Sequence, residues 1–238
     1  LFQTYAGNVS YVAMGASLRT ENNGGNFCAF NSSQPSTLTL PELDETNTLS
    51  YPGISNFGTA GDDIDSTILD AYLYWFASGD LDLASPTLAY TGTGYDTIRF
   101  VTPTSPAGTV LTADDLFIVE NVAGGADFYA GYRRVTDLMQ GSGDYDVLDI
   151  DIGVGAPWGD NQTCGGGWAL IVVYENPFEQ FRVVNLFQGF QPFQRSAFTL
   201  VPRNFRMATP NTQGEEPNGQ VTHVTLEGDE TLATGDES

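Results

Sequence analysis

Basic side chains are scarce in this chain. Its 238 residues include 8 basic and 30 acidic side chains, which gives a formal net charge of −22 at pH 7. All eight basic residues are arginines, lysine is absent, and His223 is the only histidine. The negative field repels anionic membrane surfaces and the phosphate backbone of nucleic acids, whereas it attracts cations. We therefore expect neither nucleic-acid binding nor membrane insertion.

The shortage of lysine and histidine also excludes most types of catalytic site. Without lysine there is no Schiff base, and a single histidine excludes a multi-histidine metal site. His223 lies in a polar C-terminal segment and no Gly-x-Ser-x-Gly elbow accompanies it, so a serine hydrolase is not indicated. A glycosidase with two carboxylates is the remaining class, but the spacing selects no pair among Glu120, Glu175, Asp149 and Asp151. We expect a protein that is not an enzyme.

The chain has only two cysteines, Cys28 and Cys164. They form no CxxC motif and have no companion histidine, which argues against zinc and thioredoxin-like chemistry. One long-range disulfide is the simplest use, and by chain-entropy reasoning it would contribute on the order of 4–5 kcal/mol. Such a bond indicates an oxidising compartment. Two buried free thiols in a cytosolic protein are the alternative.

Further features favour a secreted, extracellular or cell-surface protein. No stretch approaches the ~18 consecutive apolar residues of a membrane span, and the chain begins at Leu1 without a methionine or a basic, apolar leader. Asn-x-Ser/Thr sequons at Asn8, Asn31 and Asn161 are candidate glycosylation sites, although such triplets arise easily by chance in a sequence of this composition.

Short runs rich in β-branched and aromatic residues, bounded by Gly, Pro, Asn or Asp, predict about ten strands. They are Asn8–Ala13, Thr37–Leu40, Ile68–Phe76, Thr87–Thr91, Thr97–Thr102, Tyr145–Ile152, Trp168–Tyr174, Arg182–Gln188, Ser196–Val201 and Val221–Leu226. The nearly continuous apolar run Trp168–Tyr174 is typical of a central strand buried on both faces. The segment Ala113–Val122 suits a helix or a strand equally well.

This pattern predicts an all-β fold, a single β-sandwich or jelly-roll-like domain over residues 1–206. Residues 207–220 are polar with two prolines and predict a linker, followed by a C-terminal strand and tail over residues 221–238. An isolated strand gains order only by pairing. Its partner is either an open edge of its own sheet or the sheet of a neighbouring copy, and the second case makes a homo-polymer. Val221, Val224 and Leu226 are the apolar positions of this assembly strand.

Two clusters of aspartates are candidate metal ligands. The first lies in a loop before a predicted strand, and the second lies along a predicted strand, where alternate residues share a face. Hard Ca²⁺ suits such oxygen-rich clusters, but neither follows the EF-hand spacing, and a solvated acidic loop is the competing interpretation. The residues are Asp62, Asp63 and Asp65 in the first cluster and Asp144, Asp146, Asp149 and Asp151 in the second.

One aromatic residue is a candidate ligand contact. Trp158 lies in the loop sequence Gly-Ala-Pro-Trp-Gly-Asp, where an exposed indole ring could stack on a sugar ring. Trp75 and Trp168, by contrast, have the strand spacing of core residues. Glycan binding through Trp158 is therefore a second functional hypothesis.

Several sequence motifs occur together along the chain. They are Gly7-Asn-Val9, Gly15-Ala-Ser-Leu-Arg-Thr20, Cys28, Ala71-Tyr-Leu-Tyr-Trp75, the turn at Asp137, Asp149-Ile-Asp151, the run from Cys164-Gly-Gly-Gly-Trp to Tyr174-Glu-Asn-Pro177, and Asn185-Leu-Phe-Gln-Gly-Phe190. Together they resemble an uncharacterised β-sandwich domain of large secreted bacterial surface proteins. The resemblance covers roughly residues 7–201. It implies an extracellular sandwich in an adhesive or architectural setting, matches Cys28 and Cys164 to paired cysteine positions, and supplies no active-site residue.

These observations predict a non-enzymatic extracellular structural subunit. We expect it to assemble into a filament or surface layer by edge-strand exchange, with Ca²⁺ neutralising its acidic loops. The alternative is a carbohydrate-binding adhesin module of a bacterial surface.

Overall fold

The fold is all-β, as the sequence predicts. The computed structural model describes residues 1–20, 29–40, 66–79, 89–90, 94–123, 126–154, 165–177, 179–190, 199, 201–207 and 219–224. Within these ranges the only helix is a single 3₁₀ turn, η1 (Thr136–Leu138). The strands are β1 (Gln3–Gly7), β2 (Val9–Ser17), β3 (Arg19–Thr20), β4 (Ala29–Phe30), β5 (Ser36–Leu38), β6 (Thr67–Gly79), β7 (Ala89–Tyr90), β8 (Thr97–Thr102), β9 (Ser105–Thr112), β10 (Asp115–Ala123), β11 (Ala126–Arg134), β12 (Gly143–Leu148), β13 (Gly153–Val154), β14 (Gly166–Glu175) and β15 (Arg182–Leu186).

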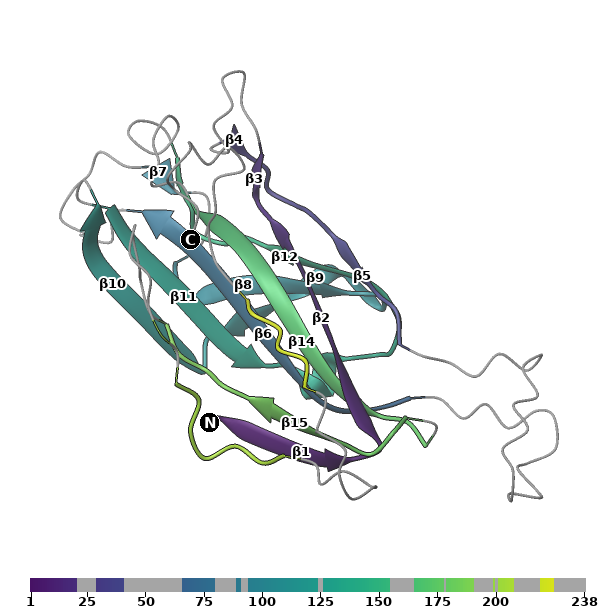
Figure 1. Ribbon diagram of the computed structural model, residues 1–238. Helices are drawn as coiled ribbons and strands as arrows, with labels where there is room; N and C mark the ends of the chain where they lie inside the picture. Colours follow the sequence, from purple (N-terminus) through teal and green to yellow (C-terminus); the bar gives the residue numbers. More distant parts are fainter. Residues whose placement is uncertain are drawn as a thin grey trace, which may run out of the picture.

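Two antiparallel sheets form a β-sandwich. A five-stranded sheet has the order β10-β11-β6-β14-β2, and a four-stranded sheet behind it in Figure 1 has the order β5-β12-β8-β9. Their inner faces share one hydrophobic core, to which the first sheet contributes Leu73, Trp75 and Leu170 and the second contributes Phe100 and Tyr145. The two sheets therefore stabilise each other by burying one apolar face each.

Strand alternation decides which residues of β6 enter this core. Ala71, Leu73, Trp75 and Ala77 are fully buried at every second position. Successive side chains of a strand point to opposite faces, so the intervening residues lie on the outer face of the sheet. This outer face is also covered, which explains why β6 and the neighbouring β14 are nearly apolar throughout.

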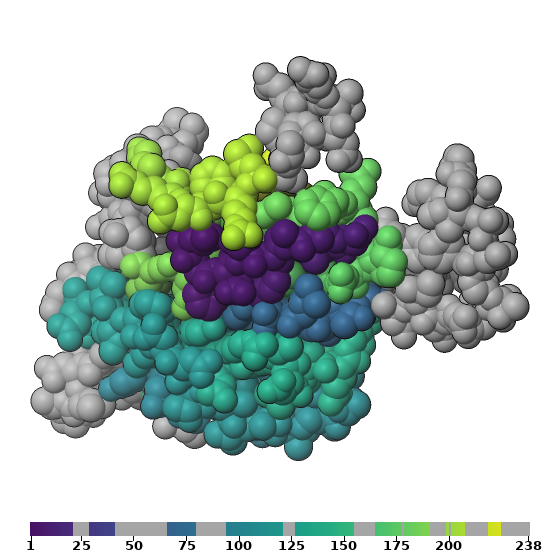
Figure 2. Space-filling model, turned by 90° about the horizontal axis from the view of Figure 1, so that it is seen from below, coloured from purple at the N-terminus to yellow at the C-terminus, as the bar shows by residue number. Residues whose placement is uncertain are grey.

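A two-stranded ribbon of β1 and β15 covers the outer face. The two strands pair antiparallel over five residues, from Gln3 opposite Leu186 to Gly7 opposite Arg182. In Figure 2 the purple N-terminal segment lies between the blue β6 and the yellow-green residues near 205. Arg206 closes this stack, because its backbone N–H and C=O both bond the side-chain amide of Asn185, at 3.1 and 2.7 Å. The molecule thus has a third, smaller layer beyond the predicted sandwich.

Most of the predicted strands are confirmed, with shifted ends. Thr97–Thr102 matches β8, and the core strands Ile68–Phe76 and Trp168–Tyr174 lie inside β6 and β14. The ambiguous segment 113–122 is a strand from residue 115 onward, as part of β10, and residues 113–114 precede the strand. Strands β1, β9 and β11 were not predicted, because their runs contain glycine, proline or polar residues that mimic turn chemistry.

Two strand predictions are wrong over described residues. Tyr145–Ile152 is not one strand: β12 ends at Leu148, and Asp149 has φ 62°, in the left-handed region, which reverses the alternation. Residues 221–224 form no strand, because no sheet edge in the described part of the chain pairs with them. The predicted strand 196–201 lies mostly outside the described residues, and Thr199 and Val201 are not in a strand.

We expect Gly131→Ala to destabilise the protein. Gly131 lies opposite Trp75 in the register of β11 and β6, and an added Cβ would lie 2.2 Å from Cε2 of the indole ring. Trp75 is fully buried and its Nε1 donates to the carbonyl of Tyr95 at 3.1 Å, so the ring cannot move without cost. Overpacking of this kind costs about 1–3 kcal/mol. Urea unfolding measures the loss.

Gly189→Ala is the matched control for this variant. No described atom lies within 4 Å of a Cβ added at Gly189, so its free energy of unfolding should stay within about 0.5 kcal/mol of the parent. Equal stability of the two variants would contradict the packing assigned to Trp75.

Candidate functional site

The outer face of the five-stranded sheet carries a cluster of aromatic side chains under the β1–β15 ribbon. The ring of Phe2 meets Tyr72 edge-on at 5.3 Å and Tyr132 at 5.6 Å between centroids. Tyr132 also stacks against Tyr72 at 6.1 Å and lies 5.4 Å from Tyr74, its cross-strand neighbour. Aromatic pairs at such separations attract one another beyond their buried area. The N-terminal segment is therefore held by ring packing as well as by strand pairing.

A polar network centred on Asp70 lies at one end of this aromatic cluster. The hydroxyl of Tyr5 donates to Oδ2 of Asp70 at 2.7 Å and lies 2.6 Å from the hydroxyl of Tyr72. Nε of Arg134 and the hydroxyl of Thr136, at 3.0 Å, donate to the other carboxylate oxygen. Four elements, β1, β6, β11 and η1, thus meet on one carboxylate.

The environment of this network fixes its protonation states. Burial acts to raise the pKa of Asp70, but hydrogen bonds from Tyr5, Arg134 and Thr136 outweigh it and hold the pKa below the ordinary 3.8. Burial, followed by the hydrogen bond to Asp70, raises the pKa of Tyr5 well above its usual range, and burial raises that of Tyr132 to about 12. The carboxylate stays charged and the phenols neutral near pH 7, so the network is suited to holding structure rather than moving protons.

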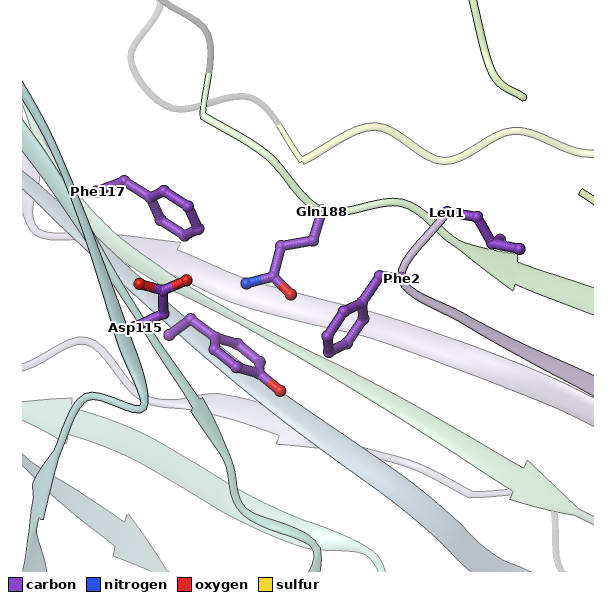
Figure 3. Close-up of a pocket in the computed structure, with 6 residues that line it drawn as sticks. Leu1, Phe2, Asp115, Phe117 and Gln188 are labelled. Carbon is purple, nitrogen blue, oxygen red and sulfur yellow. The ribbon is translucent and has the colours of Figure 1, made fainter. Parts of the chain in front are cut away.

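A pocket of about 330 Å³ opens beside the aromatic cluster, where the N-terminus meets the edge of the sheet. Figure 3 shows Gln188 between Phe117 and Phe2, with Asp115 on the Phe117 side. Its lining consists of Leu1, Phe2, Asp115, Phe117, Tyr132 and Gln188. Three aromatic rings, one carboxylate and one amide therefore converge on a single opening.

The structure does not bring the second aspartate cluster together. Asp144 accepts from the hydroxyl of Thr37 at 2.6 Å, and Asp146, which is buried, accepts from Ser33 at 2.5 Å and from the backbone of Gln34 at 3.2 Å. In the ranges that the structure describes, no group of three or more His, Cys, Asp or Glu side chains is placed to hold a metal ion.

The other two members of that cluster have separate environments as well. Asp149 forms a two-pronged ion pair with Arg99, at 2.8 and 3.1 Å, while Asp151 is buried and its carbonyl accepts from Tyr129 at 2.7 Å. The prediction that Asp149 and Asp151 share one face of a strand is wrong. Strand β12 ends at Leu148, and Asp149 has a left-handed backbone, so neither aspartate belongs to the strand. Sequence alternation alone does not reveal such a turn.

Several predicted site residues lie outside the described residues. They are Asp62, Asp63, Asp65, Cys28, Cys164, Trp158, Asn161 and Leu226. The disulfide, the first calcium cluster and glycan contact through Trp158 remain predictions.

The two described sequons are at the surface or close to it. Asn8 is exposed, and its side-chain amide donates to the carbonyl of Glu179 at 2.6 Å. Asn31 is half-buried, and its amide donates to the side chain of Gln34 at 2.7 Å. A glycan on Asn8 or Asn31 would replace these hydrogen bonds, and glycosylation stays a prediction.

The described part of the C-terminal segment lies against its own sheet without pairing. The hydroxyl of Thr222 lies 2.6 Å from that of Tyr11 on β2, so the yellow trace in Figure 1 passes over the outer face. Val221 and Val224 are 75% and 41% exposed. The segment therefore keeps its apolar side chains and its backbone available.

Three long strands lie at sheet edges, because in the described chain β2 pairs only with β14, β9 only with β8 and β10 only with β11. Strands β9 and β10 differ in how well their edges are protected. Strand β9 contains Pro106 and a left-handed Gly108, both of which discourage further pairing. Strand β10 has the sequence Asp-Leu-Phe-Ile-Val-Glu-Asn-Val-Ala, without proline or glycine, and Ile118 is 44% exposed. β10 is the more open edge.

Comparison with known proteins yields no relative. No family model, no curated protein and no solved structure matches this chain. No described helix has the length and apolar character needed to cross a membrane. The residues of the site itself therefore carry the functional argument.

We expect Asp70→Asn to destabilise the protein by about 1–3 kcal/mol at pH 7, because it weakens hydrogen bonds to a charged group. The folded-state pKa of Asp70 lies below 3.8, so its ionised form adds stability above that value. This contribution is lost as pH falls through the folded-state pKa. The difference between the variant and the parent should therefore shrink below about pH 4. Urea unfolding across a pH series measures it.

Asp137→Asn is the matched control for the Asp70 variant. Asp137 is exposed in η1, close to the same network, and forms no side-chain hydrogen bond among the described residues. Its loss should change stability by less than about 0.5 kcal/mol. A pH-independent effect of Asp70→Asn would contradict the assigned ionisation.

Proposed function

We propose that this protein is a non-enzymatic, extracellular structural subunit that assembles into a filament or surface layer by strand exchange. One observation carries the proposal: among the described residues, a segment with strand sequence has no sheet partner, and a long edge strand has no outer neighbour. The segment is Val221–Leu226, of which residues 221–224 are described, and the edge is β10.

The chemistry of the two surfaces is complementary. An open edge offers a row of backbone N–H and C=O groups, and an extended segment with alternating apolar residues can complete it. Val221, Val224 and Leu226 would supply the side chains, and Ile118 would gain cover. Because the donor and the acceptor are different surfaces, the contact is heterologous and repeats into an open polymer unless a ring closes.

The composition supports an assembly role over catalysis. The Asp70 network holds its charge state near pH 7 and links four elements of the fold. Among the described arginines, ion pairs with acidic residues of the same chain are formed by Arg99, Arg133, Arg134 and Arg182. The cysteine pair and the sequons favour an extracellular site of action.

We expect deletion of residues 221–238 to abolish assembly while leaving the sandwich folded. Among the described residues, one hydrogen bond joins the tail to the sheet, between the hydroxyls of Thr222 and Tyr11, so little stability depends on the tail. Electron microscopy and sedimentation detect polymers, and far-UV circular dichroism checks the fold. Assembly that continues in the truncated chain would reject the tail-mediated contact.

Edge variants separate the two candidate acceptors in the same assay. Ile118→Lys places a charge on β10 and should block assembly, since lysine on an edge opposes pairing. Val110→Lys places the same charge on β9, where Val110 is 67% exposed, and should leave assembly intact. The opposite result would move the contact to β9.

We propose in addition that Ca²⁺ stabilises the acidic loops. The excess of 30 acidic over 8 basic residues generates repulsion that a divalent cation relieves, and Asp62, Asp63 and Asp65 are the candidate ligands. At a hundred times its Kd, bound calcium would add about 2.7 kcal/mol to the free energy of unfolding. Thermal unfolding with calcium, with chelator and with the triple Asp→Asn variant measures this gain. Indifference of the parent to chelator would remove calcium from the proposal.

A further inference from the structure

The pocket beside the N-terminus has no role in the strand-exchange proposal, and its chemistry points to a ligand of one class. Its volume of about 330 Å³ is at the small end of ligand sites in proteins. It lies between the two residues before β1, strands β10 and β11, and the segment after β15, so residues far apart in the sequence build it. It is open to solvent, and a planar ligand enters between the rings when the Gln188 side chain, which lies between Phe117 and Phe2, shifts.

The walls of the pocket are aromatic and held in place. Phe2 and Tyr132 pack edge-to-face at 5.6 Å, and Phe117 packs against Phe190 at 6.5 Å. These contacts keep the rings at fixed positions around the opening. Aromatic faces attract cations, and guanidinium groups in particular stack on them.

The carboxylate of the pocket lacks a cation. Asp115 accepts one hydrogen bond, from the backbone N–H of Leu116 at 3.0 Å, and forms no ion pair with any residue that the structure describes. Two nearby aspartates differ in this respect, because Asp114 pairs with Arg133 and Asp70 pairs with Arg134. The negative charge of Asp115 is therefore free for a ligand.

A second acceptor in the pocket also lacks a donor. Oε1 of Gln188 is buried and has no hydrogen-bond partner in the described chain. A buried acceptor without a donor costs free energy, which a ligand that donates would recover. Arginine side chains carry five donors and no acceptor, so they complement a site whose free groups accept.

We propose that this pocket binds the guanidinium group of an arginine side chain presented by a partner polypeptide. The planar group packs against the rings of Phe2, Phe117 and Tyr132 and donates to Asp115, and it reaches the Gln188 amide oxygen once that side chain turns toward the opening. The net charge of −22 draws such cations toward the protein.

The test is a titration of the full chain with Nα-acetyl-arginine N-methylamide, followed by ¹H–¹⁵N NMR. We expect saturable shifts at residues 115–117 and 188, with a Kd of about 1 mM or below. The citrulline analogue has the same shape but no charge and should bind on the order of tenfold more weakly. The lysine analogue should also bind more weakly, since an ammonium group neither stacks on aromatic rings nor forms bidentate hydrogen bonds with a carboxylate.

Two variants assign the binding to the pocket. Asp115→Asn should weaken arginine binding on the order of tenfold, because it replaces the charged carboxylate that accepts hydrogen bonds from the guanidinium by a neutral amide. Glu120→Gln removes the same charge from an exposed position on the same strand and should leave the Kd within about twofold. Amide shifts of the free proteins show that both variants fold.

Several results would overturn the inference. They are equal binding of the arginine, citrulline and lysine analogues, an unchanged Kd in Asp115→Asn, shifts confined to other regions, tighter binding of a neutral methyl glycoside at these residues, or no shift at 10 mM arginine analogue. None of these results bears on the truncation assay, so failure of the pocket and failure of strand exchange are distinguishable.

Discussion

The structure depends on the burial of both faces of its central strands. Strands β6 and β14 place Leu73, Trp75 and Leu170 in the core of the sandwich. One end of their opposite faces is covered by the β1–β15 ribbon and by Phe2, just before β1, which packs on Tyr72. A sheet with two apolar faces is stable only when each face is covered. The ribbon is therefore part of the fold, and its position creates the aromatic cluster and the pocket at its end.

Apolar packing covers the sheet, and polar contacts fix where the ribbon lies on it. Tyr5 of β1 reaches Asp70 of β6 at 2.7 Å, and Arg134 of β11 neutralises the same carboxylate. A partly buried carboxylate without such partners would be costly, so the network selects one placement of β1 among those that would cover the rings. The aromatic packing that covers the sheet and the hydrogen bonds that anchor β1 thus lie at the same place on the outer face.

Most acidic side chains of this protein have no arginine available to pair with, because acidic residues outnumber basic ones 30 to 8. Ion pairs within the chain occupy Arg99, Arg133, Arg134 and Arg182, so the acidic surplus remains for external cations. The strand-exchange and calcium proposals use this surface differently. Backbone pairing at β10 needs no charge, whereas calcium binding relieves repulsion between aspartates. The arginine pocket extends the same logic to a single carboxylate surrounded by aromatic rings.

The sequence by itself determined the fold class and the central strands, because alternation and apolar runs such as Trp168–Tyr174 report burial directly. It also determined the acidic character and the narrow choice of chemistry. Tertiary structure alone decided that Asp144, Asp146, Asp149 and Asp151 take separate partners, that β1 forms a ribbon with β15, and that Asp115 lines one pocket with Phe2 and Gln188. These contacts join residues roughly 50 to 180 positions apart and depend on a left-handed turn and on strand order. Local patterns do not encode such pairings, because each is fixed only when the sheets pack.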